Sequence, residues 1–99
     1  MPGKILVVDD EKDINDSLSF ILEKEGYIVE QAENGKVAYE KILNSYYDLV
    51  ITDIEMPMMK GTELLEKISA LTPQTSVIMI TAYGSLETTI KALRNGAQD

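Results

Sequence analysis

Residues 5–8 read Ile-Leu-Val-Val and are followed at once by two acids, Asp9 and Asp10. Residues 49–52 read Leu-Val-Ile-Thr and are followed by a third acid, Asp53. Short apolar runs rich in β-branched residues are typical of strands that are buried on both faces of a parallel sheet. In open parallel sheets, ligands bind in the crevice beyond the carboxyl ends of the strands. We therefore expect the three carboxylates to lie together at one edge of a sheet.

The rest of the chain alternates between strand-like and helix-like segments. Strands are expected at residues 4–8, 27–32, 48–52 and 76–80, and helices at 13–25, 35–44 and 62–71, with a fourth between Ser85 and Gly96. Helical spacing of apolar residues predicts these inward-facing side chains: Ile14, Leu18, Ile21, Leu22, Val37, Ala38, Ile42, Leu64, Leu65, Ile68, Leu71, Leu86, Ile90 and Leu93. This alternation predicts an α/β fold, a parallel sheet with helices on both faces, whose more polar second strand lies near an edge.

Individual residues predict how some of these elements begin and end. Asn34 is expected to cap the second helix, and Gly26 to end the first in a left-handed conformation. Tyr46 and Tyr47 are expected to pack where the third strand begins. Gly61 is expected to allow the third helix to approach its neighbours closely, with no chemical role.

Composition narrows the function further. The 99 residues, 1–99, fit one domain, and 9 basic against 17 acidic residues give a net charge of −8. That charge argues against direct binding to nucleic acid and against binding to an anionic membrane surface. The chain has no Cys and no His, which excludes disulfides, thiol catalysis and histidine acid–base chemistry. With no leader and no apolar run of about 18 residues, we expect a cytoplasmic protein.

Clustered carboxylates at a rigid sheet edge suit a hard cation such as Mg²⁺, and one of them can serve as a nucleophile toward phosphorus. Such a reaction needs the metal, because two like charges about 4 Å apart repel by about 4 kcal/mol at an effective dielectric constant of about 20. A simpler interpretation holds for each acid taken singly. Strand-end acids often cap helices, and Asp10 is placed to cap the first helix.

Four segments together resemble the receiver domain of two-component response regulators. They are residues 7–11 (Val-Val-Asp-Asp-Glu), 53–61 (Asp-Ile-Glu-Met-Pro-Met-Met-Lys-Gly), 80–84 (Ile-Thr-Ala-Tyr-Gly) and 95–99 (Asn-Gly-Ala-Gln-Asp). Residues 80–99 are most similar to receivers attached to σ54-dependent activators. The resemblance implies a flavodoxin-like, doubly wound parallel sheet with strand order 2-1-3-4 and three αβα layers.

The resemblance also implies a role for each site residue. Asp53 would accept a phosphoryl group and share in holding Mg²⁺. Asp10 would bind the metal directly and Asp9 largely through water, with the backbone carbonyl of Glu55 as a further ligand. Thr81 would supply the hydroxyl that moves onto the phosphoryl group.

Partners follow from the same resemblance. A sensor histidine kinase would donate the phosphoryl group, and the chain's own output domain, of the σ54-activator ATPase type, would respond to it. Glu55 and Tyr83 occupy variable positions that influence how long the phosphoryl group survives. A receiver promotes only its own phosphorylation and dephosphorylation, so we do not expect a conventional enzyme.

The sequence departs from the receiver pattern at its end. Receivers continue into a fifth strand with a Lys-Pro pair and a fifth helix, whereas this chain ends at Asp99. We therefore expect a truncated receiver, in which the missing lysine leaves a phosphorylated site with about two uncompensated negative charges and makes phosphorylation poor. Residues 77–82 would form an exposed, uncharged strand edge, and we expect dimer formation or exchange of elements through it.

Three other functions compete with this interpretation. A phosphatase with an aspartate nucleophile would need a second Asp two residues on, where this chain has Glu55. A nucleotide or flavin site would need a glycine-rich loop, but residues 9–12 read Asp-Asp-Glu-Lys and would repel phosphate. An interaction or dimerisation module that does not use phosphorylation is the alternative that stays open.

Overall fold

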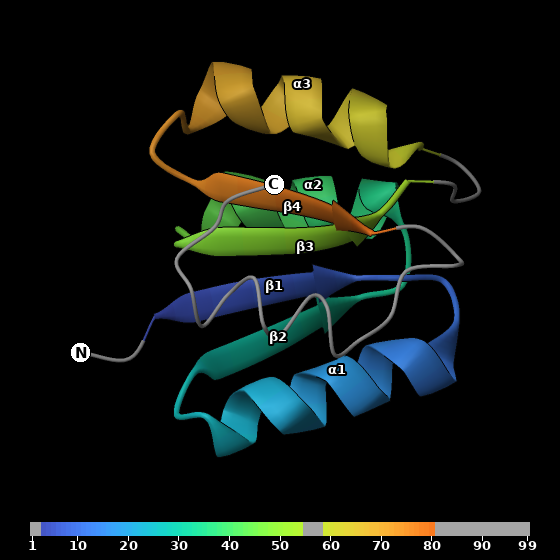
Figure 1. Cartoon of the computed structure of the whole chain (residues 1–99). Helices are drawn as coiled ribbons and strands as arrows, with labels where there is room; N and C mark the ends of the chain where they lie inside the picture. Colours follow the sequence, from blue (N-terminus) through green and yellow to red (C-terminus); the bar gives the residue numbers. More distant parts are fainter. Residues whose placement is uncertain (1–2, 55–58, 81–99) are drawn as a thin grey trace.

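The computed structural model describes residues 3–54 and 59–80, which form a parallel sheet with helices on both faces (Figure 1). The elements follow in the order β1 (Lys4–Val8), α1 (Lys12–Lys24), β2 (Ile28–Ala32), α2 (Gly35–Asn44), β3 (Leu49–Asp53), α3 (Gly61–Leu71) and β4 (Ser76–Ile80). The strands lie in the order β2-β1-β3-β4, and every pairing is parallel. The expected flavodoxin-like sheet in the order 2-1-3-4 is therefore confirmed, with the polar second strand at its edge.

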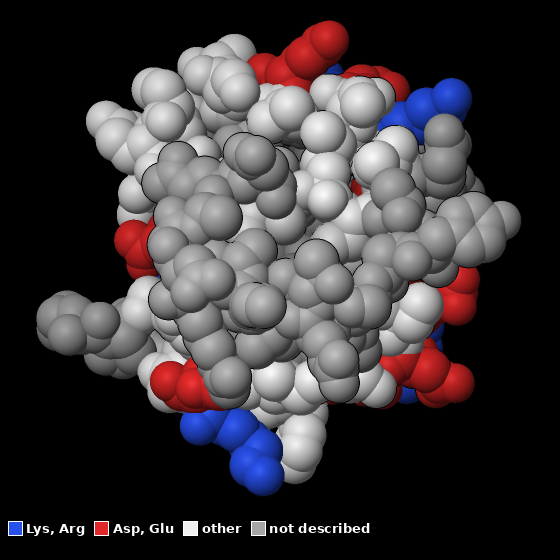
Figure 2. All heavy atoms as spheres, in the orientation of Figure 1, with Lys and Arg blue, Asp and Glu red and all other residues white. Residues whose placement is uncertain are grey.

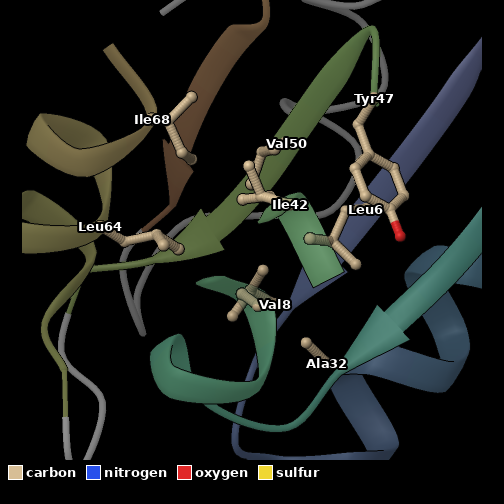
Figure 3. Close-up of a cluster of buried hydrophobic side chains, with 9 residues drawn as sticks. Leu6, Val8, Ala32, Ile42, Tyr47, Val50, Leu64 and Ile68 are labelled. Atoms are coloured by element: carbon tan, nitrogen blue, oxygen red, sulfur yellow. The ribbon is translucent and has the colours of Figure 1, made fainter. Parts of the chain in front are cut away.

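Two hydrophobic cores flank the sheet, because alternate residues of each strand point to opposite faces. On one face, Leu6 and Val8 of β1 pack with α2 and α3, as Figure 3 shows for the buried side chains around Val50. On the other face, Ile5 and Val7 pack against α1. Both faces of β1 are thus buried from Ile5 to Val8, directly before the first acid of the chain.

The ends of the elements follow local rules that the sequence reveals. Asn34 caps α2, its side-chain Oδ1 accepting a hydrogen bond from the Val37 N–H at 2.9 Å. Gly26 follows α1 with φ of +99°, a left-handed conformation that glycine adopts without steric cost. Helix and strand bounds differ from the expected ones by at most one residue.

Two side chains that were expected to pack, Leu71 and Tyr46, are exposed. Leu71 is 48% exposed, whereas Leu64 and Ile68 on the same helix are fully buried. Leu71 occupies the last turn of α3, at the rim of the sheet where β3 and β4 begin (Figure 1), so it has left the core. Tyr46 is 52% exposed, because only its neighbour Tyr47 turns into the core before β3.

Some expectations fall on residues outside the described ranges. These are the fourth helix between Ser85 and Gly96 and the strand-like residues beyond Ile80. Pairing of two chains through residues 77–82 stays a prediction. Among the described helices, none has the length and apolar character needed to cross a membrane. Figure 2 shows acidic side chains on several sides of the face in view, in keeping with the net charge of −8.

Candidate functional site

The three acids singled out in the sequence lie together at the carboxyl edge of the sheet. β1 ends at Val8, so Asp9 and Asp10 follow directly, and β3 ends with Asp53 itself. The parallel register places Val8 beside Thr52, which brings the two acidic strand ends next to each other. One carboxylate oxygen from each acid lies within 4.8 Å of the others. We call Asp9, Asp10 and Asp53 the acidic cluster.

The position of the cluster follows from the strand order. The chain passes from β1 to β2 on one side and later to β3 on the other, so β1 and β3 flank the point where the winding direction changes. Such a switch point leaves a crevice outside the strand ends, since the connections leave it toward opposite faces. The topology therefore opens a binding position where the acidic cluster lies.

Asp9 is the most buried member, with only 3% of its surface exposed. Its Oδ1 accepts a hydrogen bond from the Glu11 N–H at 2.8 Å, which forms a tight turn after β1. Burial raises the pKa of the Asp9 carboxyl to about 6 from its ordinary 3.8. The Glu11 N–H opposes this rise in pKa, and the negative charges of Asp53 and Asp10 add to it. A cation bound at the cluster would offset these negative charges.

Asp10 and Asp53 are placed differently. Asp10 is exposed, and Asp53 retains 9% exposure at the open edge of the sheet. The expectation that Asp10 caps the first helix is wrong: Glu11 occupies the N-cap position, without a side-chain hydrogen bond. The turn made by Asp9 determines where α1 begins, and this leaves the carboxylate of Asp10 at the surface of the cluster.

Gly61 brings the start of α3 against the end of β3. Its N–H donates to the Ile54 carbonyl at 2.8 Å, and a Cβ at this position would lie 2.3 Å from the carbonyl oxygen of Asp53. No side chain fits into that space without moving backbone atoms. The expected role of Gly61, close approach of the helix, is confirmed, and that approach supports the backbone of Asp53.

A hollow of about 260 Å³ opens beside Asp9 and Asp10, between the ends of β1 and β2 and the start of α1. Asp16 lies in its wall and is held by Lys12 at 2.8 Å and by the Gln31 side-chain amide at 2.9 Å. These two contacts lower the pKa of Asp16. Most residues that line the hollow are acidic or otherwise polar, so a hydrated cation can approach the cluster from this side.

Asn15 lies in the same wall and was missed in the sequence. It is 4% exposed, and its side-chain amide nitrogen contacts the main-chain carbonyls of Val7, Asp9 and Ala32. One signal could have identified it. Asn15 lies three residues before Leu18 on the buried stripe of α1, and a polar residue on an apolar stripe needs buried partners.

The remaining predicted site residues lie outside the described ranges. Glu55, Thr81 and Tyr83 belong to residues 55–58 and 81–99. Ile80, the last described residue of β4, lies beside Asp53 in the register of the sheet. Thr81 is the next residue along the chain.

The donor set of the acidic cluster fits Mg²⁺. All three groups are carboxylates, which are hard oxygen ligands, and they project from rigid strand ends rather than from long loops. Mg²⁺ retains several waters when bound to proteins, and the exposed position of Asp10 beside the open hollow leaves room for them. The cluster can therefore hold a divalent ion and also present Asp53 as a nucleophile.

Comparison with known proteins points in the same direction. A family model for the response regulator receiver domain matches residues 5–99. The chain is 44% identical over 96 residues to the response regulator protein PilR of Pseudomonas aeruginosa, an alignment that covers 97% of this chain and 22% of PilR. It is 41% identical over 95 residues to the transcriptional regulatory protein ZraR of Escherichia coli, with coverage of 96% and 22%. The chain thus spans less than a quarter of either relative.

Solved structures agree with the sequence matches. A CheY-like receiver domain protein of Methanospirillum hungatei superposes with a TM-score of 0.81 at 45% identity, covering 98% of this chain and 78% of that one. The response regulator protein TrrA of Thermotoga maritima, solved in complex with Mg²⁺–BeF, gives a TM-score of 0.79 at 40% identity. That match covers 94% of this chain and 80% of TrrA.

Proposed function

The chain belongs to the response regulator receiver domain family, and on this basis we propose that Asp53 accepts a phosphoryl group from the phosphohistidine of a sensor histidine kinase. The observation that carries the proposal is the acidic cluster. Two separate strands deliver three carboxylates to within 4.8 Å of one another, at the switch point of the sheet. If these acids only capped helices and stayed solvated, we would not expect them to lie so close together.

Asp53 is placed to act as the nucleophile. It lies at the open end of a buried strand, so its carboxylate is held by the sheet and is still reachable from solvent. In the proposed step a carboxylate oxygen of Asp53 forms a bond to phosphorus while the phosphorus–nitrogen bond of the phosphohistidine breaks. The electron pair leaves with the histidine nitrogen, which takes up a proton from water. The product is an acyl phosphate on Asp53.

The other two acids would hold the metal. Asp10, being exposed, would bind Mg²⁺ directly, and the buried Asp9 would contact it largely through water, with Asp53 and the Glu55 carbonyl as further ligands. Bound Mg²⁺ would offset the negative charge of the cluster and of the incoming phosphoryl group. Among the described residues, the turn made by Asp9 and the contact of Gly61 keep the two strand ends in place.

Thr81 would transmit the effect of phosphorylation from the site to the rest of the protein. A phosphoryl group adds about two negative charges and three acceptor oxygens, and the hydroxyl of Thr81 would move toward it and donate a hydrogen bond. We propose that this movement switches an output domain, of the kind carried by transcriptional regulators such as the matched relatives, in the cytoplasm. The receiver would act only on itself and not as an enzyme on separate substrates.

A phosphorylation assay tests the proposal. The chain is incubated with Mg²⁺ and a small-molecule acyl phosphate, and the intact mass is measured. We expect a mass increase of one phosphoryl group that is absent in Asp53→Asn. Asp48→Asn is the matched control: Asp48 precedes the same strand at its opposite end, where its side chain accepts a hydrogen bond from the Lys4 N–H. It should be phosphorylated like the wild type.

The negative charge that remains at the phosphorylated site argues for a low yield. Asp9 and Asp10 contribute two negative charges and the phosphoryl group about two, while Mg²⁺ offsets two, so about two remain. The decisive result is therefore which residue is modified. Phosphorylation that persists in Asp53→Asn, or that never occurs in the wild type, would contradict the proposal and favour an interaction module independent of phosphorylation.

A further inference from the structure

Asn15 joins three segments that meet behind the acidic cluster. Its side-chain nitrogen lies 3.2 Å from the Val7 carbonyl, 3.3 Å from the Asp9 carbonyl and 3.1 Å from the Ala32 carbonyl. The hydroxyl of Ser19, one turn along α1, donates to Asn15 Oδ1 at 3.3 Å. That contact directs the amide oxygen toward the helix and the amide nitrogen toward the strand ends.

These contacts lie where the pairing between β1 and β2 ends. The last pair in the register is Val8 with Ala32, and the Asp9 N–H still donates to the Ala32 carbonyl at 3.1 Å. Beyond that bond the chain leaves the sheet to enter α1. The amide of Asn15 supplies donors to carbonyls on both strands at this point, so the main chain of Asp9 is held through its N–H and through its carbonyl.

A fixed main chain matters at Asp9 because its neighbours repel it. Three carboxylates within 4.8 Å of one another repel one another and would move apart if the backbone did not hold them in place. The Asp9 side chain is also fixed, by the Glu11 N–H at 2.8 Å. With its main chain held from both sides, Asp9 has little freedom to move away from Asp10 and Asp53. An arrangement formed before the metal arrives avoids the cost of assembling it on binding.

We propose that Asn15 is a positioning residue for the divalent-cation site, holding Asp9 at the distance from Asp10 and Asp53 that the cation requires. The inference rests on the proposed function, because it concerns the same three carboxylates. Asn15 need not touch the metal or the phosphoryl group. It would act through Asp9, as residues behind metal ligands often do.

The test compares Mg²⁺ affinity in three chains: wild type, Asn15→Ala and Thr75→Val. Thr75 is a matched control, since its buried hydroxyl donates at 2.6 Å to the Tyr47 carbonyl at the opposite end of the sheet. Mg²⁺ is titrated into each chain under conditions where it is fully folded, and the amide signals of Asp10 and Asp53 are followed by NMR. We expect Asn15→Ala to bind Mg²⁺ about 10- to 100-fold more weakly, the range typical for groups that support metal ligands. Thr75→Val should bind like the wild type.

A second variant keeps the positioning role testable. If Asn15→Ala does not fold, Asn15→Ser, which retains one hydroxyl donor, takes its place, and it should weaken Mg²⁺ binding by a smaller factor. A folded Asn15 variant that binds Mg²⁺ as tightly as the wild type would overturn the positioning role alone. A wild-type chain without affinity for Mg²⁺ would overturn the metal site of the proposed function, and the positioning role with it.

Discussion

Two adjacent residues of the same type, Asp9 and Asp10, occupy opposite environments. Asp9 is 3% exposed and its pKa is raised to about 6, chiefly by burial, whereas Asp10 is exposed. Without metal, the folded chain therefore retains a proton on Asp9 at pH values where the unfolded chain has lost it. Folding a chain with an ionised Asp9 has a free-energy cost that metal binding would offset.

The first prediction is that Asp9→Asn stabilises the metal-free protein at pH 7. Asparagine retains the oxygen that accepts from the Glu11 N–H but carries no buried charge. Between pH 4 and 6 the folded wild type binds more protons than the unfolded chain, so its free energy of unfolding falls as the pH rises. The shift of about two pH units corresponds to at most about 3 kcal/mol, which water at the open edge reduces to about 1–2 kcal/mol.

Urea unfolding in EDTA, at several pH values, measures this difference. The gap between Asp9→Asn and the wild type should open between pH 4 and 6 and stay constant above. Mg²⁺ should narrow the gap by stabilising only the wild type. The Asp48→Asn control, at an exposed site, should show no such gap. A metal-free Asp9→Asn that is no more stable than the wild type at pH 7 would show that the charge of Asp9 has no cost.

At the scale of single residues, the sequence identifies which residues can form the site but not how deeply each one is buried. The acidic cluster is predictable, because each acid directly follows an apolar strand and parallel strand ends meet at one edge. The burial of Asp9 is not, since it depends on α1 and on contacts with Ala32, a residue 23 positions away from Asp9. The contacts of Asn15 are hidden for the same reason: its three acceptors lie in β1, directly after β1 and in β2, which meet only in the folded chain.

At the scale of the elements, the start of α3 packs directly against the end of β3. Its first residue, Gly61, contacts the backbone of Asp53 and Ile54, so the start of this helix and the end of β3 cannot move independently. A shift of α3 would displace the carboxylate of Asp53. The hydrogen bond from the Gly61 N–H to the Ile54 carbonyl links the two elements directly.

The second prediction concerns Gly61→Ala. In a helix interior this change stabilises by about 1 kcal/mol, but here the added Cβ would lie 2.3 Å from the Asp53 carbonyl oxygen. We expect the collision to outweigh the helical gain and to destabilise the chain by about 1–3 kcal/mol, the usual cost of overpacking. Phosphorylation of Asp53 should slow as well, because the end of β3 must move.

Chemical denaturation and the mass assay together measure both effects. Thr62→Ala changes the next residue of the same helix, an exposed one, and should alter neither stability nor phosphorylation appreciably. If Gly61→Ala were as stable and as readily phosphorylated as Thr62→Ala, the close approach of α3 would have no bearing on the site.

Element positions were predictable from the sequence almost to the residue, because apolar periodicity, Asn34 and Gly26 are local signals. The errors arose where tertiary context decides. Leu71 has the spacing of a core residue but lies past the edge of the sheet. Asp10 has the chemistry of a helix cap, but Asp9 makes the turn and places the N-cap at Glu11.

On the scale of the whole molecule, the strand order is what creates the site. Placing β1 between β2 and β3 positions the first and third strands on either side of the switch point, and both carry acid at their carboxyl ends. Two cores, one on each face, hold these strands in place, and Figure 3 shows the core under α2 and α3. The chain spans less than a quarter of relatives such as PilR.

The central claim is that Asp9, Asp10 and Asp53 form one phosphoryl-accepting metal site, and NMR titration with Mg²⁺ and beryllofluoride tests it most directly. Beryllofluoride imitates a phosphoryl group on a carboxylate. With both ligands present, we predict amide shifts confined to the ends of β1 and β3 and to Thr81, and their loss in Asp53→Asn. Shifts that are scattered over the fold, that need no Mg²⁺, or that persist in Asp53→Asn would contradict the claim.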